Sequence, residues 1–474
     1  MRESAGRHLH DVHHTAVLRL RTLRRMVIVP GTSEPNSLTR RARVDGPAGS
    51  AASATKVATP GPPNDSRTDS VGYDHGMIDP RGQETLSGSA QSEIFQILRD
   101  GQPRTRSELA TLTGLARSTV AARVDALLKA RLISSVAHAA STGGRPSRQF
   151  AFDGTQQGVI GVDIGATHVH IGVSDLHGTL LYDTEVSLSV AEGPETVLKW
   201  VIDEGSRLLD DHGVPGFLRA VGVGVPGPVE HQTGRPVDPP IMPGWDRFDV
   251  PGMLSDAFGV PVLVDNDVNV MAVGERNDHW PDVDDLLFVK VSTGIGAGVI
   301  TSGRVHRGAQ GIAGDIGHVY VSGADDVLCR CGSTGCLEAV AGGPAIAAAL
   351  RTAGLDVASP QDIAAAVNQG DIEAVRAVRE AGRVIGRVLT TCVSLMNPAV
   401  IVIGGPIANA GDHLVAGARE IIYTRAAPLA TGSLQIVRSR GTDKAAVSGA
   451  SSMAIQHALS VDSVEALVRE LASS

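Results

Sequence analysis

Residues 158–175 read GVIGVDIGATHVHIGVSD, and this stretch decides the fold class. The apolar run at 159–162 is typical of a buried strand, and the alternation of apolar residues over 169–173 is typical of a second strand. A polar turn at 163–167 joins them, and a further turn leads into a third strand at 179–182. Helical patterns alternate with strands beyond this point, so the sequence predicts an α/β domain.

A similar order of elements recurs later in the chain. Residues 287–291 form an apolar strand, residues 292–296 a Gly-rich polar turn, and residues 298–301 a second strand. Another turn follows at Ser302-Gly303. The two copies share a pattern rather than identical residues, and they predict an internally duplicated fold.

Upstream of the first strand, residues 91–150 show the pattern of three short helices and a hairpin. Thr105 and Glu108 form a capping box that starts one helix. We expect Leu109 and Leu112 to face inward and Gly114 to supply a tight turn.

The next helix starts near Ala116 and shows a buried face at helical spacing. We expect that face to contain Val120, Val124, Leu127 and Leu128. The opposite face presents short polar and basic residues at the helix start, as a DNA recognition helix requires. Residues 143–148 (GGRPSR) are typical of a wing, with glycines at the hairpin tip. The segment predicts a winged helix-turn-helix, and a three-helix packing module with a basic face is the alternative. Candidate DNA contacts are Arg106, Arg117, Ser118, Thr119, Arg123, Arg145 and Arg148.

Charge distribution supports a small nucleic-acid module on a larger body. The whole chain has a net charge of −9, yet residues 93–150 hold nine Lys/Arg against four Asp/Glu. Double-stranded DNA is therefore the expected macromolecular partner. No apolar run of eighteen residues occurs, so we expect no membrane span and a cytoplasmic location.

Residues 1–88 are rich in Arg, Ser, Pro, Gly and Asp and lack sustained periodicity. Such a composition cannot build a core, so the sequence predicts a disordered N-terminal extension. Met77 is an alternative candidate for the first residue.

Three of the four cysteines cluster with one histidine in the spacing H-x10-C-x-C-x4-C. In a cytosolic chain such clustering favours a metal over disulfides. Four ligands of this kind close a tetrahedral shell, which predicts a structural zinc site; three incidental thiols are the alternative. Cys392 stands alone in an apolar helical stretch and is expected in the core. The predicted ligands are His318, Cys329, Cys331 and Cys336.

From about Gln91 to its end, the chain resembles the ROK family (repressors, open reading frames and sugar kinases), in its regulator branch. The resemblance implies a duplicated actin-like, sugar-kinase (ribonuclease H-like) domain of two lobes, with sugar and ATP meeting in a cleft between them. The implied domains are residues 89–153 for the winged helix-turn-helix, 157–268 for the first lobe and 269–474 for the second. The second lobe carries the zinc motif, and the C-terminal helix is expected to pack on the first lobe.

Three Gly-rich segments match the family's nucleotide motifs. Residues 163–167 (DIGAT) match its first phosphate loop, although Ala166 and His168 stand where kinases usually have glycine and lysine. Residues 292–298 (STGIGAG) match the second loop, and residues 403–406 (IGGP) match the adenosine-side motif with Pro406 in place of glycine. Proline removes an N–H, which disfavours nucleotide binding there. The implied phosphate-side residues are Asp163, Gly165, Thr167, Thr293, Gly294, Gly296, Gly404 and Gly405.

The family's sugar-contacting residues are matched more fully than its nucleotide motifs. Asp267 matches the catalytic base of the kinases, and the same carboxylate can hold a sugar where no chemistry occurs. Asp315 stands in place of a glutamate, and Ile241 stands where many kinases place a sugar-contacting asparagine. A zinc-bound His318 would have its second ring nitrogen fixed as a donor toward a sugar hydroxyl. The implied sugar ligands are Asn266, Asp267, Asp315, His318 and Glu338.

These features favour a sugar-responsive transcriptional regulator, expected to be a repressor of carbohydrate genes. The expected partners are operator DNA, a sugar effector and further copies of the chain in a homodimer or homotetramer. One alternative is an ATP-dependent sugar kinase with a fused DNA-binding head, for which ATP and Mg²⁺ would be cofactors. The other is a constitutive DNA-binding scaffold whose effector domain binds nothing.

Overall fold

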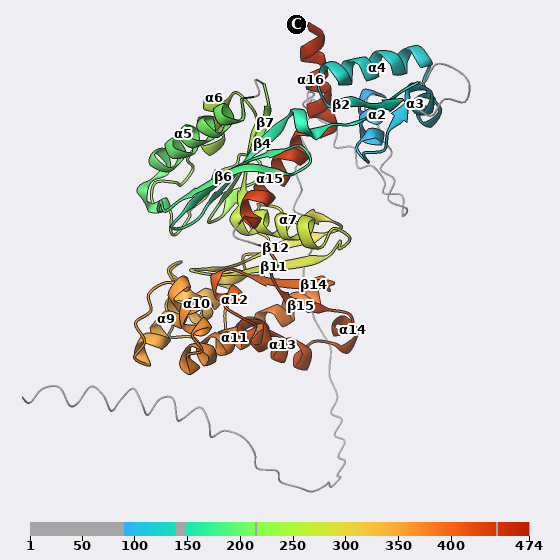
Figure 1. Cartoon of the computed structure of the whole chain (residues 1–474). Helices are drawn as coiled ribbons and strands as arrows, with labels where there is room; N and C mark the ends of the chain where they lie inside the picture. Colours follow the sequence, from blue (N-terminus) through green and yellow to red (C-terminus); the bar gives the residue numbers. More distant parts are fainter. Residues whose placement is uncertain (1–89, 139–146, 214–215, 442–443, 474) are drawn as a thin grey trace, which may run out of the picture. The chain divides into compact units, whose positions relative to one another are not determined.

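The computed structural model describes residues 90–138, 147–213, 216–441 and 444–473 (Figure 1). The expected N-terminal extension and the tip of the expected wing, including Arg145, lie outside these residues.

Two five-stranded sheets of the same topology form the body of the structure. In each, three antiparallel strands run consecutively, and two later strands add in parallel on the other side of the first. The predicted duplication is therefore confirmed. The first sheet has the order β10 (Val262–Asn266), β7 (Leu218–Val225), β4 (Gly158–Ile164), β5 (Val169–Asp175) and β6 (Leu180–Val186). The second has the order β13 (Arg304–Val305), β12 (Ile295–Thr301), β11 (Leu286–Val291), β14 (Val400–Gly404) and β15 (Gln435–Arg438).

The first sheet is covered on both faces. Ile160, Val162 and Ile164 point into a core formed with α5 (Pro194–His212) and α6 (Val250–Phe258). Since side chains alternate along a strand, Gly161 and Asp163 point to the opposite face. That face carries α15 (Ala445–Ala458). Short strands β8 (Val229–Glu230) and β9 (Arg235–Pro236) and the 3₁₀ turns η2 (Gly154–Gln156) and η3 (Val190–Glu192) complete this part.

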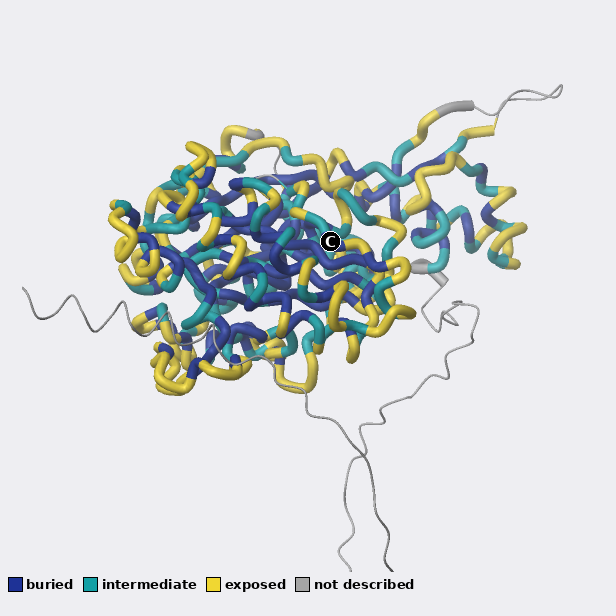
Figure 2. The backbone as a smooth tube through the Cα atoms, turned by 90° about the horizontal axis from the view of Figure 1, so that it is seen from below, coloured by how far each residue is buried: buried dark blue, intermediate teal, exposed yellow. Residues whose placement is uncertain are grey.

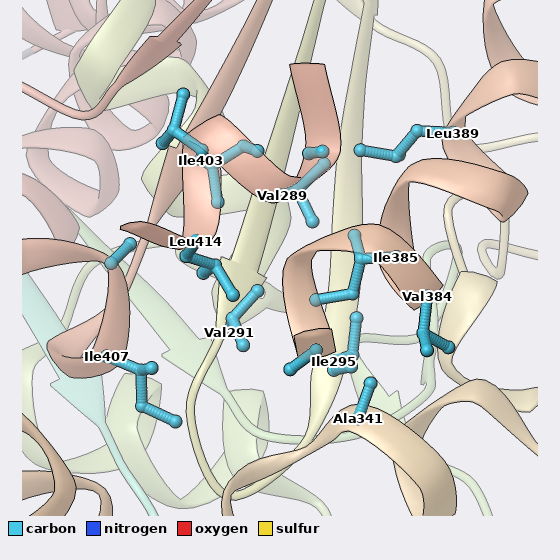
Figure 3. Close-up of a cluster of buried hydrophobic side chains, with 14 of the residues drawn as sticks. Val289, Val291, Ile295, Ala341, Val384, Ile385, Leu389, Ile403, Ile407 and Leu414 are labelled. Atoms are coloured by element: carbon cyan, nitrogen blue, oxygen red, sulfur yellow. The ribbon is translucent and has the colours of Figure 1, made fainter. Parts of the chain in front are cut away.

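The second sheet buries its outer face under a group of helices. Val289 and Ile403 from the sheet point toward Ile385, Leu389 and Leu414 from two of these helices (Figure 3). The longest helix, α11, is amphipathic, and no helix within the described residues is long and apolar enough to cross a membrane. The helices are α8 (Leu337–Ala341), α9 (Gly343–Thr352), α10 (Pro360–Asn368), α11 (Ile372–Met396), α12 (Pro406–Asn409), α13 (His413–Arg425) and α14 (Pro428–Thr431), and η4 (Ile316–His318) precedes them.

Helices α7 (Asp267–His279) and α15 lie between the two sheets (Figure 1). Helix α7 packs on β11 and β12, α15 packs on β4 and β7, and the helices pack on each other. The backbones of the two helices are in contact. A Cβ atom added at Gly449 would collide with the Val270 carbonyl, and a Cβ atom added at Gly274 would collide with the Ala445 carbonyl. Glycines thus permit the close approach that joins the lobes.

The N-terminal head contains three helices and a three-stranded sheet. The predicted capping box is present: Glu108 N–H bonds to Thr105 Oγ1, and Thr105 N–H bonds to Glu108 Oε2. Gly114 ends that helix with φ of 68°. The prediction that Leu112 faces inward is wrong, because the Leu112 residue is 58% exposed. The helix is short, and Leu109 is its buried residue. The elements are α2 (Ala90–Leu98), β1 (Arg104–Thr105), α3 (Arg106–Thr113), α4 (Arg117–Lys129), β2 (Ile133–His138) and β3 (Arg148–Phe152).

One apolar cluster joins the head to the first lobe and to α16 (Val461–Ser473). Phe95 and Val124 of the head belong to it with Val159 of β4 and with Val464 and Val468 of α16. A hydrogen bond from Lys129 Nζ to the Leu471 carbonyl adds a polar contact. Buried segments run through both the head and the body (Figure 2). The head is therefore packed against the body and is not only tethered to it.

The α7–α15 contact generates a stability prediction. We expect Gly449→Ala to lower the free energy of unfolding by about 1–3 kcal/mol, since the new methyl group would overlap the Val270 carbonyl. Thermal and urea denaturation measure this. The control is Gly432→Ala, at φ −61° with only ordinary contacts, which should be neutral or slightly stabilising. Equal stability of the two variants would contradict the packing described above.

Candidate functional site

The side chain of His168 lies against the first phosphate-type loop, residues 163–167. Gly165 N–H donates to the His168 carbonyl at 2.8 Å, and His168 Nε2 lies 3.3 Å from Asp163 Oδ2. A Cβ at Gly165 would collide with the His168 ring, so the imidazole covers this glycine. The hydrogen bond with Asp163 raises the pKa of His168. Thr167 is exposed beside this pair.

Asp267 is paired with a lysine that the sequence reasoning missed. Its Oδ2 accepts a hydrogen bond from Lys290 Nζ at 2.6 Å, and its side chain is only 7% exposed. Burial opposes the charged form of Lys290, but attraction to Asp267 and Asp163 outweighs it and the pKa of Lys290 is raised. A charged residue inside the apolar strand LLFVKV was the signal that would have revealed the pair.

The neighbours of Asp267 hold its helix in place. Asp265 accepts hydrogen bonds from Arg307 Nε at 2.7 Å and from Asn269 Nδ2 at 2.9 Å. Asn266 caps α7 through Oδ1 to the Val268 N–H and donates from Nδ2 to the Gly227 carbonyl. The predicted sugar ligand Asn266 therefore has both polar ends engaged in structural hydrogen bonds.

Glu338 lies against the second loop. Its Oε2 accepts a hydrogen bond from the Ile295 N–H at 3.3 Å, and a Cβ at Gly294 would collide with the same oxygen. Gly317, next to His318, also packs on the Ile295 carbonyl. The structure thus brings Gly294, Glu338 and the His318 turn together. Asp315 is exposed at the start of that turn.

The third glycine motif, residues 403–406, forms a turn that leads into a short helix. Gly405 has φ of 97° and precedes Pro406, the first residue of the four-residue helix α12. Gly404 packs on the Phe288 ring. Pro406 cannot donate a backbone hydrogen bond at this helix start, so the motif lacks one of the N–H groups that a phosphate would use.

The four predicted metal ligands converge. One ligand atom from each of His318, Cys329, Cys331 and Cys336 lies within 4.8 Å of the others. His318 Nδ1 is 3.8 Å from Cys329 Sγ, and Cys331 Sγ is 3.7 Å from Cys336 Sγ. Tetrahedral zinc with ordinary bond lengths places such atoms roughly 3.5–3.8 Å apart, so these two distances match those expected around the ion. Gly332 and Gly335, at φ of 88° and 73°, make the bends of the loop.

Two of the thiols have pKa values that are shifted in opposite directions. The backbone N–H of Ser333 lowers the pKa of Cys331 to about 7, whereas burial raises the pKa of Cys336 to about 12. A bound metal would replace the remaining thiol protons. With Nδ1 of His318 facing the sulfurs, Nε2 is the ring nitrogen left for another partner.

The candidate DNA residues occupy different environments on the head. Arg117 and Ser118 are exposed at the start of α4, whereas Thr119 and Arg123 are half-buried. Arg106 pairs with Asp125, and its guanidinium lies 5.1 Å from the centre of the Phe150 ring. Arg148 is exposed at the start of β3. Among the candidate arginines that the structure describes, Arg117 and Arg148 are therefore the two that are exposed.

A model of the ROK family matches residues 159–457. The chain belongs to the ROK family. The matched segment includes both sheets, the Asp267–Lys290 pair and the metal cluster, so these features belong to the ROK domain itself.

Relatives of this ROK protein include regulators and kinases. A putative xylose repressor from Caldicellulosiruptor sp. is 29% identical over 77% of this chain and 95% of its own length. The crystal structure of a ROK family transcriptional regulator, described as a homologue of the Escherichia coli MLC protein, matches with a TM-score of 0.69. It is 26% identical and covers 80% of this chain and 98% of its own. A ROK family glucokinase from Streptomyces griseus, solved with glucose and AMPPNP, matches with a TM-score of 0.53 and 28% identity over 63% of this chain and 99% of its own.

The metal cluster generates the next prediction. We expect Cys331→Ser to lower zinc content, measured by elemental analysis, and to lower the melting temperature, since a closed four-ligand shell stabilises the loop. Cys392→Ser is the control: this cysteine is partly buried against the core of the second lobe, outside the cluster, so zinc content should stay unchanged. Freshly purified wild-type protein without bound zinc would refute a structural zinc site.

Proposed function

We propose that this protein is a sugar-responsive transcriptional repressor. In this proposal residues 89–153 are a winged helix-turn-helix that binds operator DNA, and the ROK lobes (157–268 and 269–474) bind the sugar and a structural zinc ion. The observation that carries the proposal is the packed head: α4 exposes Arg117 and Ser118 while its opposite side joins the cluster shared with the body. The repressor relatives support it, since their alignments exceed the length of the ROK-matched segment.

Helix α4 has the properties of a recognition helix. Val120, Val124 and Leu127 are buried, and Arg117 and Ser118 are exposed at the N-terminal end, where base contacts are made. Ala116 precedes the helix and has no side-chain oxygen to cap it, which leaves the first N–H groups for a phosphate. Arg148 continues the basic surface onto β3.

A physical route connects the proposed sugar site to the head. Asp267 starts α7, α7 packs on α15, and α15 leads into α16, which packs on α2 and α4. A second connection runs directly from β3 of the head into β4 of the first lobe. If sugar favours a closed arrangement of the lobes, both connections move the head. In a symmetric dimer this changes the separation of two recognition helices, with a coupling of about 1–3 kcal/mol.

The alternative is an ATP-dependent sugar kinase, and the glucokinase relative together with Asp267 favours it. His168 over Gly165 and Pro406 in the third motif oppose it. A coupled assay with ATP and a panel of hexoses and amino sugars distinguishes the two, because a repressor without phosphotransfer activity gives no ADP. A constitutive scaffold is distinguished by thermal shift, because a ligand that binds only the native state must raise the melting temperature.

The proposal as a whole is tested by footprinting. Purified full-length protein is incubated with genomic DNA of its source organism, with and without D-xylose, D-glucose or N-acetylglucosamine. We expect protected sites with two-fold symmetry and release of at least one site by one sugar. Absence of protected sites at low salt would contradict the proposal.

A head variant tests the recognition helix. Arg117→Ala should weaken binding to the best footprinted site by about 1–3 kcal/mol, the usual value of one good base contact, without lowering the melting temperature. Fluorescence anisotropy measures the affinity. The control is Arg376→Ala, which removes an exposed arginine from α11 and should leave DNA affinity unchanged. Unchanged affinity in Arg117→Ala would mean that another helix reads the DNA.

Variants of the sugar site test the effector response. Asp267→Ala and Glu338→Ala should each abolish sugar-dependent release from the operator and leave sugar-free DNA binding intact, since neither residue lies in the head. Asp256→Ala, which removes an exposed carboxylate from α6, is the control that should respond as the wild type does. A full response of either site variant would show that the sugar binds elsewhere.

A further inference from the structure

The duplication places opposite charges at equivalent positions of the two lobes. Asp163 is the last residue but one of β4, and Lys290 is the last residue but one of β11. These two strands hold the same place in their sheets, each between an antiparallel and a parallel neighbour. Asp163 pairs in register with His170 and Gly224, and Lys290 with Gly296 and Gly404.

Both side chains point to the faces between the sheets. On β4, Asp163 shares its face with Gly161, which packs on α15. On β11, Lys290 shares its face with Phe288, which packs with Val268 and Ala272 of α7. This alternation aims the ammonium group at the start of α7, where its Nζ lies 2.6 Å from Asp267 Oδ2.

The resulting cluster sets two acidic side chains against two basic ones. Two carboxylates, Asp163 and Asp267, face the Lys290 ammonium and the His168 imidazole. Lys290 is attracted to both carboxylates and opposes protonation of His168, so all four groups interact. About 22% of the lysine side chain and 7% of the Asp267 side chain are exposed, which leaves little water to screen the charges.

Phosphoryl transfer would need a metal ion and a free carboxylate at this cluster. A nucleotide brings its metal ion to carboxylates beside the Gly-rich loops, and a free carboxylate accepts the hydroxyl proton. Here an ammonium already occupies the Asp267 oxygen, and an imidazole covers Gly165 of the first loop. The Lys290 ammonium supplies internally a positive charge that a metal ion would otherwise bring.

We propose that Lys290 is a built-in replacement for the divalent cation that accompanies a nucleotide, so that this site takes an uncharged sugar without nucleotide or divalent cation. The sugar part of this inference rests on the proposed function, whereas the cation part does not. Lys290 then keeps both lobes' carboxylates neutralised when no ligand is bound. Its removal should expose a carboxylate pair that attracts a metal ion.

The test is a Mn²⁺ titration of zinc-saturated full-length protein, followed by electron paramagnetic resonance of free Mn²⁺. Wild type and Lys290→Arg should leave millimolar Mn²⁺ essentially free. Lys290→Met, whose unbranched side chain is one atom shorter and uncharged, should bind one Mn²⁺ at least tenfold more tightly. The double variant Lys290→Met with Asp267→Asn should lose that binding.

One outcome would overturn the proposal. Equal Mn²⁺ binding by wild type and Lys290→Met would show that the lysine does not hold the cation position. This outcome counts when the melting temperature and circular dichroism of Lys290→Met match those of the wild type. If Lys290→Met does not fold, Lys290→Gln replaces it with the same expectations. Because the titration uses neither DNA nor sugar, its failure is separate from a failure of footprinting.

Discussion

Helices α7 and α15 cross between the two sheets with their backbones in contact, because Gly274 and Gly449 lack side chains at the crossing. Each helix also lies close to a sheet: a Cβ at Gly298 would strike α7, and one at Gly222 would strike α15. Interiors are packed without spare volume, so the spacing between the lobes is set by these glycines. The site residues depend on that spacing, since Asp267 begins α7 and Lys290 approaches it from β11.

The same helices connect the site to the head. Helix α15 continues into α16, and α16 completes the apolar cluster of the head with Val464 and Val468. A ligand that changes the arrangement of α7 therefore acts on elements that already touch both the lobes and the head. Coupling requires only that the ligand bind one arrangement more tightly than the other. The loop that carries the His/Cys cluster also connects two parts of the site. It links the His318 turn to the helix that carries Glu338.

Carboxylates at the centre of this ROK domain are paired with basic side chains. Asp163 is paired with His168, Asp265 with Arg307 and Asp267 with Lys290. Each buried carboxylate thus has a partner supplied by the chain, which offsets the cost of removing it from water. A phosphate would have to displace these partners and would also face Glu338 at Gly294.

The sequence by itself determined the features that depend on local order: the strand and turn pattern of both repeats, the Thr105–Glu108 capping box, and the spacing of His318, Cys329, Cys331 and Cys336. It also indicated the family through its motifs. Only the tertiary structure decided that Leu112 is exposed, that Asn266 is used as a cap, and that Lys290 reaches Asp267 from another strand. These facts depend on contacts between residues distant in the chain, and periodicity reports which face of an element is apolar but not what lies opposite it.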